Sequence, residues 1–131
     1  MILAILLSIL VMAIATLHII WGIGFWFPIA DEAALVRAVV GFSGAKEMPG
    51  AVPCALVGVA LYMAVACLWW PHGAFRFLAL VVVGVVFVAR GIVTYTPFWR
   101  KLTPTEPFAT LDRKYYGPLC LVLGLGFWIS I

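Results

Sequence analysis

Long apolar stretches alternate with short polar segments along this chain. Four of the stretches have the length and composition of membrane-crossing helices, because about 20 apolar residues span the roughly 30 Å hydrocarbon layer of a bilayer. We expect these helices at about residues 2–27, 51–70, 75–95 and 115–131. No Lys or Arg precedes the first stretch, which is also longer than a signal-peptide core, so we expect it to be retained as a helix.

Two polar segments connect these stretches. Within residues 29–50, the segment Asp31–Val40 has acidic residues at its start and Arg37 near its end, which suits the dipole of a helix. Its apolar residues, Leu35 and Val36 among them, predict a short amphipathic helix. The pattern as a whole predicts an all-α fold over residues 1–131: one integral membrane domain, built as a four-transmembrane-helix bundle with an amphipathic helix in the first loop.

The composition supports the membrane class. Hydrophobic residues make up 66% of the 131 residues and charged residues 10%, whereas soluble domains have about 45–50% and about 25%. These values exclude a disordered chain and argue against a soluble domain. The three cysteines lie in apolar runs without a CxxC pair, which favours packing roles.

The basic residues indicate topology rather than nucleic-acid binding. The net charge is +3, and the excess positive charge lies in loops beside the membrane, where it also attracts anionic lipids. The middle loop contains only Arg76. The first and third loops contain six basic residues, namely Arg37, Lys46, Arg100, Lys101, Arg113 and Lys114. The positive-inside rule therefore predicts cytoplasmic first and third loops, with both termini outside.

Most of the unusual polar residues fall at this cytoplasmic end. Arg90 lies inside the third predicted helix, where a charge costs about 2.5–3.5 kcal/mol on insertion scales. Its candidate partners are Asp112 and Glu47, and the alternatives are snorkelling to the interface and anchoring of a ligand. Tyr115 and Tyr116 follow Asp112 by three and four residues, so a helix would place all three on one face.

His18 and Trp21 belong to the same end of the first helix. His18 has three readings: a neutral side chain that satisfies a carbonyl group, an acid–base or ligand contact in a pocket, or a metal or haem ligand. The membrane part of the chain has no second histidine, which disfavours the third reading. We therefore expect no metal and no cofactor.

The chain resembles a bacterial family of small four-helix integral membrane proteins, a domain of unknown function. The family pattern runs His-x-x-Trp, then an Arg in the third helix, then Phe-x-x-x-Asp-x-x-x-Tyr-x-Pro-Leu-Cys. Residues 17–22, 88–91 and 108–121 carry the resemblance. It implies a location in the bacterial inner membrane and no established activity. It marks as the residues to test His18, Trp21, Arg90, Asp112, Tyr115 and Pro118.

These observations lead to one main hypothesis and two alternatives. We expect a polar and aromatic pocket at the cytoplasmic end that binds an amphipathic small molecule or a lipid. The ligand-binding candidates are His18, Trp21, Glu47, Arg90, Asp112, Tyr115 and Tyr116. Whether the protein is an enzyme stays open; a cofactor-free lipid-modifying enzyme or isomerase would use His18 or Asp112 as acid or base.

The alternatives are an accessory subunit of a larger membrane complex and a small oligomeric transporter. In the subunit hypothesis, the small residues of the second predicted helix, such as Ala55 and Gly58, form a docking surface. The partners expected from the sequence are membrane lipids and an amphipathic ligand, with a homo-oligomer or a larger complex left open.

Overall fold

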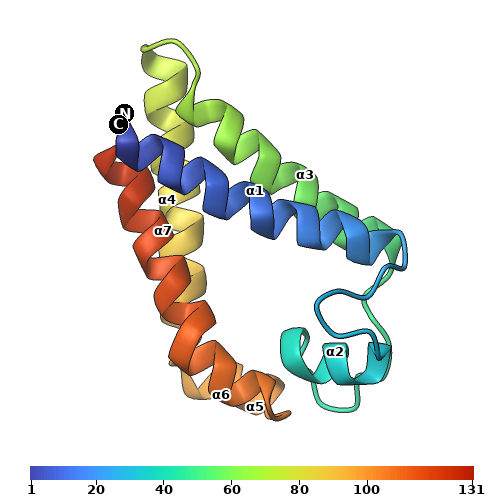
Figure 1. The fold of residues 1–131 in the computed structure, drawn as a ribbon. Helices are drawn as coiled ribbons and strands as arrows, with labels where there is room; N and C mark the ends of the chain where they lie inside the picture. Colours follow the sequence, from blue (N-terminus) through green and yellow to red (C-terminus); the bar gives the residue numbers. More distant parts are fainter.

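The computed structural model describes residues 1–131, and the fold is all-α (Figure 1). Three helices, α1, α3 and α4, are long and apolar enough to cross a membrane. Shorter helices follow or connect them. The elements in chain order are α1 (Ile2–Gly22), α2 (Glu32–Val39), α3 (Ala51–Leu68), α4 (Ala74–Val93), α5 (Pro97–Leu102), α6 (Phe108–Leu111), the π-helix η1 (Asp112–Tyr116) and α7 (Gly117–Ile129).

The four long helical segments form two pairs. α1 packs along α3, and α4 packs along α7. The pairs meet at one end, which we call the vertex, and diverge toward the other, which we call the open end; both termini lie at the vertex (Figure 1). The arrangement is therefore a V of two helix pairs.

Glycines bring α4 and α7 into close contact. Gly84 and Gly91 of α4 are seven residues apart, as are Gly117 and Gly124 of α7. A Cβ atom at Gly124 would lie 2.9 Å from the carbonyl oxygen of Gly84, and one at Gly91 would lie 2.9 Å from that of Gly117. Small residues at matching positions let two apolar helices approach closely, so these glycines determine the spacing of this pair.

The main apolar core lies at the vertex, where all four long helical segments contribute side chains. Val11, Leu80, Leu123 and Phe127 are each at most 1% exposed there. At the same end, Arg76 is buried and its guanidinium donates to the carbonyl oxygens of Leu68 and Ser130. These oxygens belong to the C-terminal ends of α3 and α7, which have no intrahelical partners of their own.

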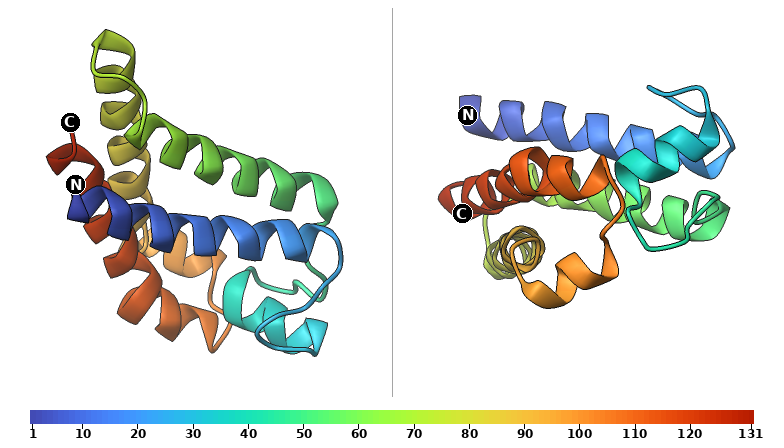
Figure 2. Two further views of the ribbon diagram at one scale, coloured as in Figure 1. Left: turned by 45° about the horizontal axis from the view of Figure 1, so that its top comes forward. Right: turned by 90° about the horizontal axis from the view of Figure 1, so that it is seen from below.

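The amphipathic helix expected in the first loop is present as α2. The side chain of Asp31 accepts a hydrogen bond from the backbone N–H of Ala34 and caps the helix, as such residues commonly do. Leu35 and Val36 are buried. The turned views show α2 beside the loop-side ends of α1 and η1 (Figure 2), so it partly closes the open end of the V.

Two helix boundaries differ from the sequence prediction. The first helix ends at Gly22 instead of residue 27, because Gly24 adopts a φ of 83° that starts an irregular segment. The last helix is not a single α-helix from residue 115. It is preceded by the π-helical turn η1, and α7 itself has 13 residues.

Candidate functional site

A fully buried carboxylate, Asp112, organises the open end of the α4–α7 pair. Its Oδ1 accepts from Arg90 Nη2 at 2.8 Å and from Thr94 Oγ1 at 3.4 Å. Its Oδ2 accepts from Trp99 Nε1 at 2.9 Å and from Arg100 Nη2. A buried charge is expensive unless it is paired and hydrogen-bonded, and these four donors meet that condition.

Three elements position Asp112 and its four donors. Arg90 lies on α4 and Thr94 directly follows that helix, Trp99 and Arg100 belong to α5, and Asp112 is the first residue of η1. The side chain of Thr96 caps α5 by accepting from the backbone N–H of Trp99, and a proline follows at the first helical position, where proline is favoured. The network therefore fastens the loop between α4 and α7 to both helices.

Arg90 is the member of the network that also lines a cavity. Its Nη1 donates to Thr94 Oγ1 at 2.6 Å, and its guanidinium carbon lies 5.1 Å from the centre of the Trp99 ring. One third of its side chain is exposed, whereas Asp112 behind it is fully buried. The guanidinium is thus held in one orientation from behind and is open toward the cavity.

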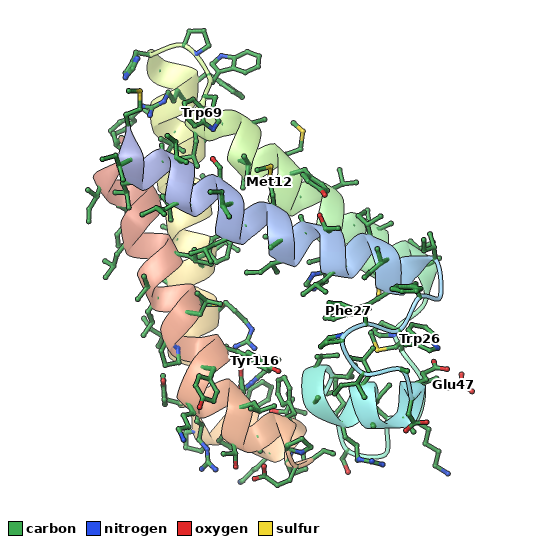
Figure 3. All side chains as sticks on the ribbon, viewed as in Figure 1. Met12, Trp26, Phe27, Glu47, Trp69 and Tyr116 are labelled. Atoms are coloured by element: carbon green, nitrogen blue, oxygen red, sulfur yellow. The ribbon has the colours of Figure 1, made fainter.

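The cavity lies in the V between the two helix pairs. It has a volume of about 620 Å³, within the usual range for small-molecule sites. Its wall comes from α1, α2, α4, α6, η1 and α7 and from the chain after α1, and 14 of the 17 lining residues are hydrophobic. Figure 3 shows the side chains that project into this space. Such a wall suits an apolar ligand with few polar atoms.

His18 and Trp21 contribute polar groups from the α1 side. His18 Nδ1 lies 2.8 Å from the carbonyl oxygen of Ile14. Because a carbonyl oxygen only accepts, we assign the proton to Nδ1, which leaves Nε2 of the neutral ring as an acceptor. The indole N–H of Trp21 donates to the carbonyl oxygen of Phe27, and its ring centre lies 5.1 Å from that of His18.

Tyr116 connects the two sides of the V. Its hydroxyl donates to the carbonyl oxygen of Ala38 on α2 at 3.0 Å, and its ring packs against Phe108. In Figure 3 its side chain lies on the inner side of the α7 arm. The phenol is thus used as a donor between η1 and α2.

The region just described lies within a recognised sequence family. A family model described as "Protein of unknown function (DUF3995)" matches residues 11–127. The chain belongs to the DUF3995 family. None of the curated proteins and none of the solved structures matches the chain. The match includes every residue of the Asp112 network and every residue of the cavity wall, so both lie inside the DUF3995 region.

The structure brings four of the seven predicted site residues to the cavity wall and places a fifth directly behind it. His18, Trp21, Arg90 and Tyr116 line the cavity, and Asp112 holds Arg90 from behind. Of the two partners proposed for Arg90, Asp112 and Glu47, the structure shows that Asp112 forms the ion pair.

The remaining two, Glu47 and Tyr115, point elsewhere. Glu47 is exposed and extends away from the V (Figure 3). Tyr115 is 55% exposed, with the ammonium group of Lys114 5.5 Å from its ring centre. The expected shared face of Asp112, Tyr115 and Tyr116 assumed α-helical spacing. In η1 the N–H of Gly117 instead bonds to the carbonyl oxygen of Asp112, five residues back, which turns Tyr115 outward.

Sequence reasoning missed Thr94, Trp99 and Arg100. Trp99 resembles an interfacial tryptophan, and Arg100 resembles a topology-setting loop cation. The one available signal is that Thr94 follows Arg90 by four residues, which predicts contact on a helix. Of the two small residues named above for a docking surface on α3, Gly58 is buried against Ile19 of α1, and Ala55 is partly buried.

No group of three or more His, Cys, Asp or Glu side chains is placed to hold a metal ion. The polar side-chain groups of the cavity wall are one guanidinium, one imidazole, one phenol, one indole N–H and one thiol, within an otherwise apolar lining.

Proposed function

We propose that this DUF3995 protein is an integral membrane protein that binds an amphipathic small molecule or lipid in the cavity of the V. The observation that carries the proposal is the cavity itself: about 620 Å³ of largely apolar space with Arg90, His18 and Tyr116 in its wall. Apolar pockets with a few convergent polar groups are the usual form of a small-molecule site.

Membrane insertion with four crossings is part of the proposal. The most apolar 18-residue stretches of α1, α3 and α4 have a mean hydropathy of 2.7, 2.3 and 2.3. α7 supplies the fourth crossing: its 13 residues extend about 20 Å, and the helix continues without a break into η1 and α6. The first and third loops, which hold six of the eight basic residues, lie at the open end, while both termini lie at the vertex (Figure 1). The positive-inside rule then orients the cavity toward the bacterial cytoplasm.

The chemical division of the cavity supports an amphipathic ligand. Leu17, Phe87 and Leu123 form part of its apolar wall, against which an acyl or prenyl chain would be buried. Arg90, His18 and Tyr116 supply polar groups in the same wall. A ligand with one polar head and one apolar tail satisfies both kinds of lining residue at once.

The test uses a fluorescent amphiphile and a blocked cavity. The protein in lipid nanodiscs is titrated with 11-(dansylamino)undecanoic acid and with its uncharged primary amide, and binding is read as energy transfer from the protein's tryptophans. Leu17→Trp should fill part of the cavity and lower the affinity for the bound probe by at least about tenfold, because the tail loses its apolar contacts.

Ile9→Trp is the matched control. It adds the same fluorescence donor to the same helix at an exposed position outside the cavity. Its affinity for each probe should therefore equal that of the wild type. Equal transfer in Leu17→Trp and Ile9→Trp for both probes would mean that the signal comes from the bilayer, and the proposed function would be abandoned.

A further inference from the structure

We propose that the ligand of this cavity is a single-chain amphiphile with a monoanionic head group, a long-chain carboxylate, and that Arg90 is the residue that selects the charge. This inference rests on the proposed function, because it names the class of ligand for the same cavity. Three observations carry it: the charge balance of the Asp112 network, the unused donors of Arg90, and the apolar character of the rest of the wall.

The charge balance around Asp112 leaves one positive charge over. The structure has two ion pairs, Arg90–Asp112 and Arg100–Asp112. Two guanidinium groups share one carboxylate, so two positive charges minus one negative charge leave a formal excess of +1. Arginine keeps its charge in proteins, so only a further anion can neutralise this excess in an apolar setting.

No other acid of the chain reaches Arg90. Asp31 caps α2, Glu32 accepts from the backbone N–H of Met48, and Glu106 accepts from the backbone N–H of Thr110. Glu47 is exposed at the outer edge of the molecule (Figure 3). The anion that completes the site must therefore come from outside the chain.

Arg90 has donors left for that anion. A guanidinium carries five N–H groups; one is used by Thr94 and one by Asp112, which leaves three. Arg100 lies behind the network, donates to the carbonyl oxygen of Ala109, and is not part of the cavity wall. Arg90 is thus the only cation that a ligand in the cavity can touch.

The geometry of Arg90 suits recognition of a carboxylate. Its guanidinium is fixed by Asp112 and Thr94, and its face lies over the Trp99 ring. A guanidinium held in this way presents its remaining N–H groups as a planar fork that matches a carboxylate. Because the side chain is already ordered before the ligand arrives, binding loses little side-chain entropy.

The rest of the wall limits the ligand to one head and one tail. Fourteen of the 17 lining residues are hydrophobic. The polar atoms of His18, Trp21 and Tyr116 are each engaged at least once with a backbone carbonyl oxygen. Arg90 is therefore the residue of the wall that has the most N–H groups left for a ligand.

The experiment compares the two dansyl probes, which have the same chain and fluorophore and differ in head-group charge. In wild-type protein the acid should bind about tenfold more tightly than the amide, the gain expected from a charge-assisted hydrogen-bonded pair. In Arg90→Gln the affinity for the acid should fall to that of the amide, while the affinity for the amide stays unchanged. Arg37→Gln removes an exposed cation outside the cavity and should keep the tenfold preference.

The outcomes separate this inference from the proposed function. If both probes bind wild type equally and Leu17→Trp releases both, the cavity binds amphiphiles but the charge assignment is wrong. If neither probe responds to Leu17→Trp, both proposals fail. The wild-type ratio tests the charge of the head group even if Arg90→Gln does not fold, because it needs no variant of the network. A folded Arg90→Gln protein that keeps the tenfold preference would overturn the assignment of Arg90.

Discussion

The helices of the V are held together by different interactions at the vertex and at the open end. At the vertex, apolar side chains such as Leu80 and Phe127 fill the space between the helix pairs, and buried Arg76 satisfies the last carbonyl oxygens of α3 and α7. At the open end, the pairs diverge: a smaller apolar cluster that includes Trp21 and Leu35 packs α2 against α1, and polar contacts from Asp112 and Tyr116 hold the side of α4 and η1.

The difference teaches where binding can occur. Fully buried side chains such as Leu80 and Phe127 fill the vertex core, and the hollow at that end, about 650 Å³ beside Trp69 and Arg76, lies outside this core. The open end keeps a cavity of about 620 Å³ because a network of directed hydrogen bonds holds its walls in place. Binding is thus assigned to the open end, where the hydrogen-bond network contributes to stability as well, whereas apolar packing stabilises the vertex.

The largest effect is expected at the open end from Asp112→Ala. It leaves Arg90 and Arg100 without their shared carboxylate, and loss of one partner of a buried ion pair costs about 3 kcal/mol or more. We expect a lower free energy of unfolding in detergent, followed by circular dichroism, and loss of the acid preference. Glu47→Ala removes an acid without such partners and should change neither quantity. An Asp112→Ala protein as stable as wild type would show that the network does not hold the open end together.

A smaller effect is expected at the α4–α7 contact from Gly124→Ala. The added Cβ would lie 2.6 Å from Val88 Cγ2 and 2.9 Å from the carbonyl oxygen of Gly84, and overpacking of this kind costs about 2 kcal/mol. The same unfolding measurement checks this value. Ala89→Leu enlarges an exposed position on the same helix pair and should cost little.

Gly124→Ala also sharpens the comparison between the ends. Gly124 does not line the cavity, so the folded variant should bind the dansyl acid with wild-type affinity. A loss of binding in the folded variant would mean that the spacing of α4 and α7 sets the shape of the cavity, and the two ends would then not be independent.

The apolar pattern identified the three long helices and α2, because each has a run or face of apolar residues that needs burial or lipid. It also placed Arg90 and Asp112 at one end, with Asp112 as one of two candidate partners. It could not give the V, because the pattern of apolar residues does not say which helices pack along each other or where the two pairs diverge. The end of the first helix at Gly22 depends on one backbone conformation at Gly24.

The outward position of Tyr115 could not be predicted from the sequence, because it also depends on a local backbone conformation. A single π-helical turn changes which residues share a face, and no composition signal marks it. Trp99 and Arg100 were missed because short-range periodicity says nothing about how a loop with several prolines folds back onto α4. Arg90 and Asp112 could be predicted because their positions along the helices place them at one end of the molecule. Trp99 and Arg100 could not, because their positions depend on the path of the loop.

The smallest expected effect also separates the two interpretations of Trp99. Trp26 makes no side-chain hydrogen bond in the structure, so we expect it to tolerate replacement by phenylalanine. If Trp99 were only an interfacial tryptophan, it should tolerate the same replacement equally well. As a network member, it donates to Asp112 and lies beside the guanidinium of Arg90. Trp99→Phe should therefore cost about 1 kcal/mol of unfolding free energy through the lost hydrogen bond, and Trp26→Phe close to none.

The sharper readout is the acid-to-amide affinity ratio: it should fall in Trp99→Phe, because a less firmly held Arg90 loses pre-organisation, and stay at the wild-type value in Trp26→Phe. Equal ratios in the two variants would return Trp99 to the membrane interface and leave Asp112 and Thr94 as the groups that orient Arg90.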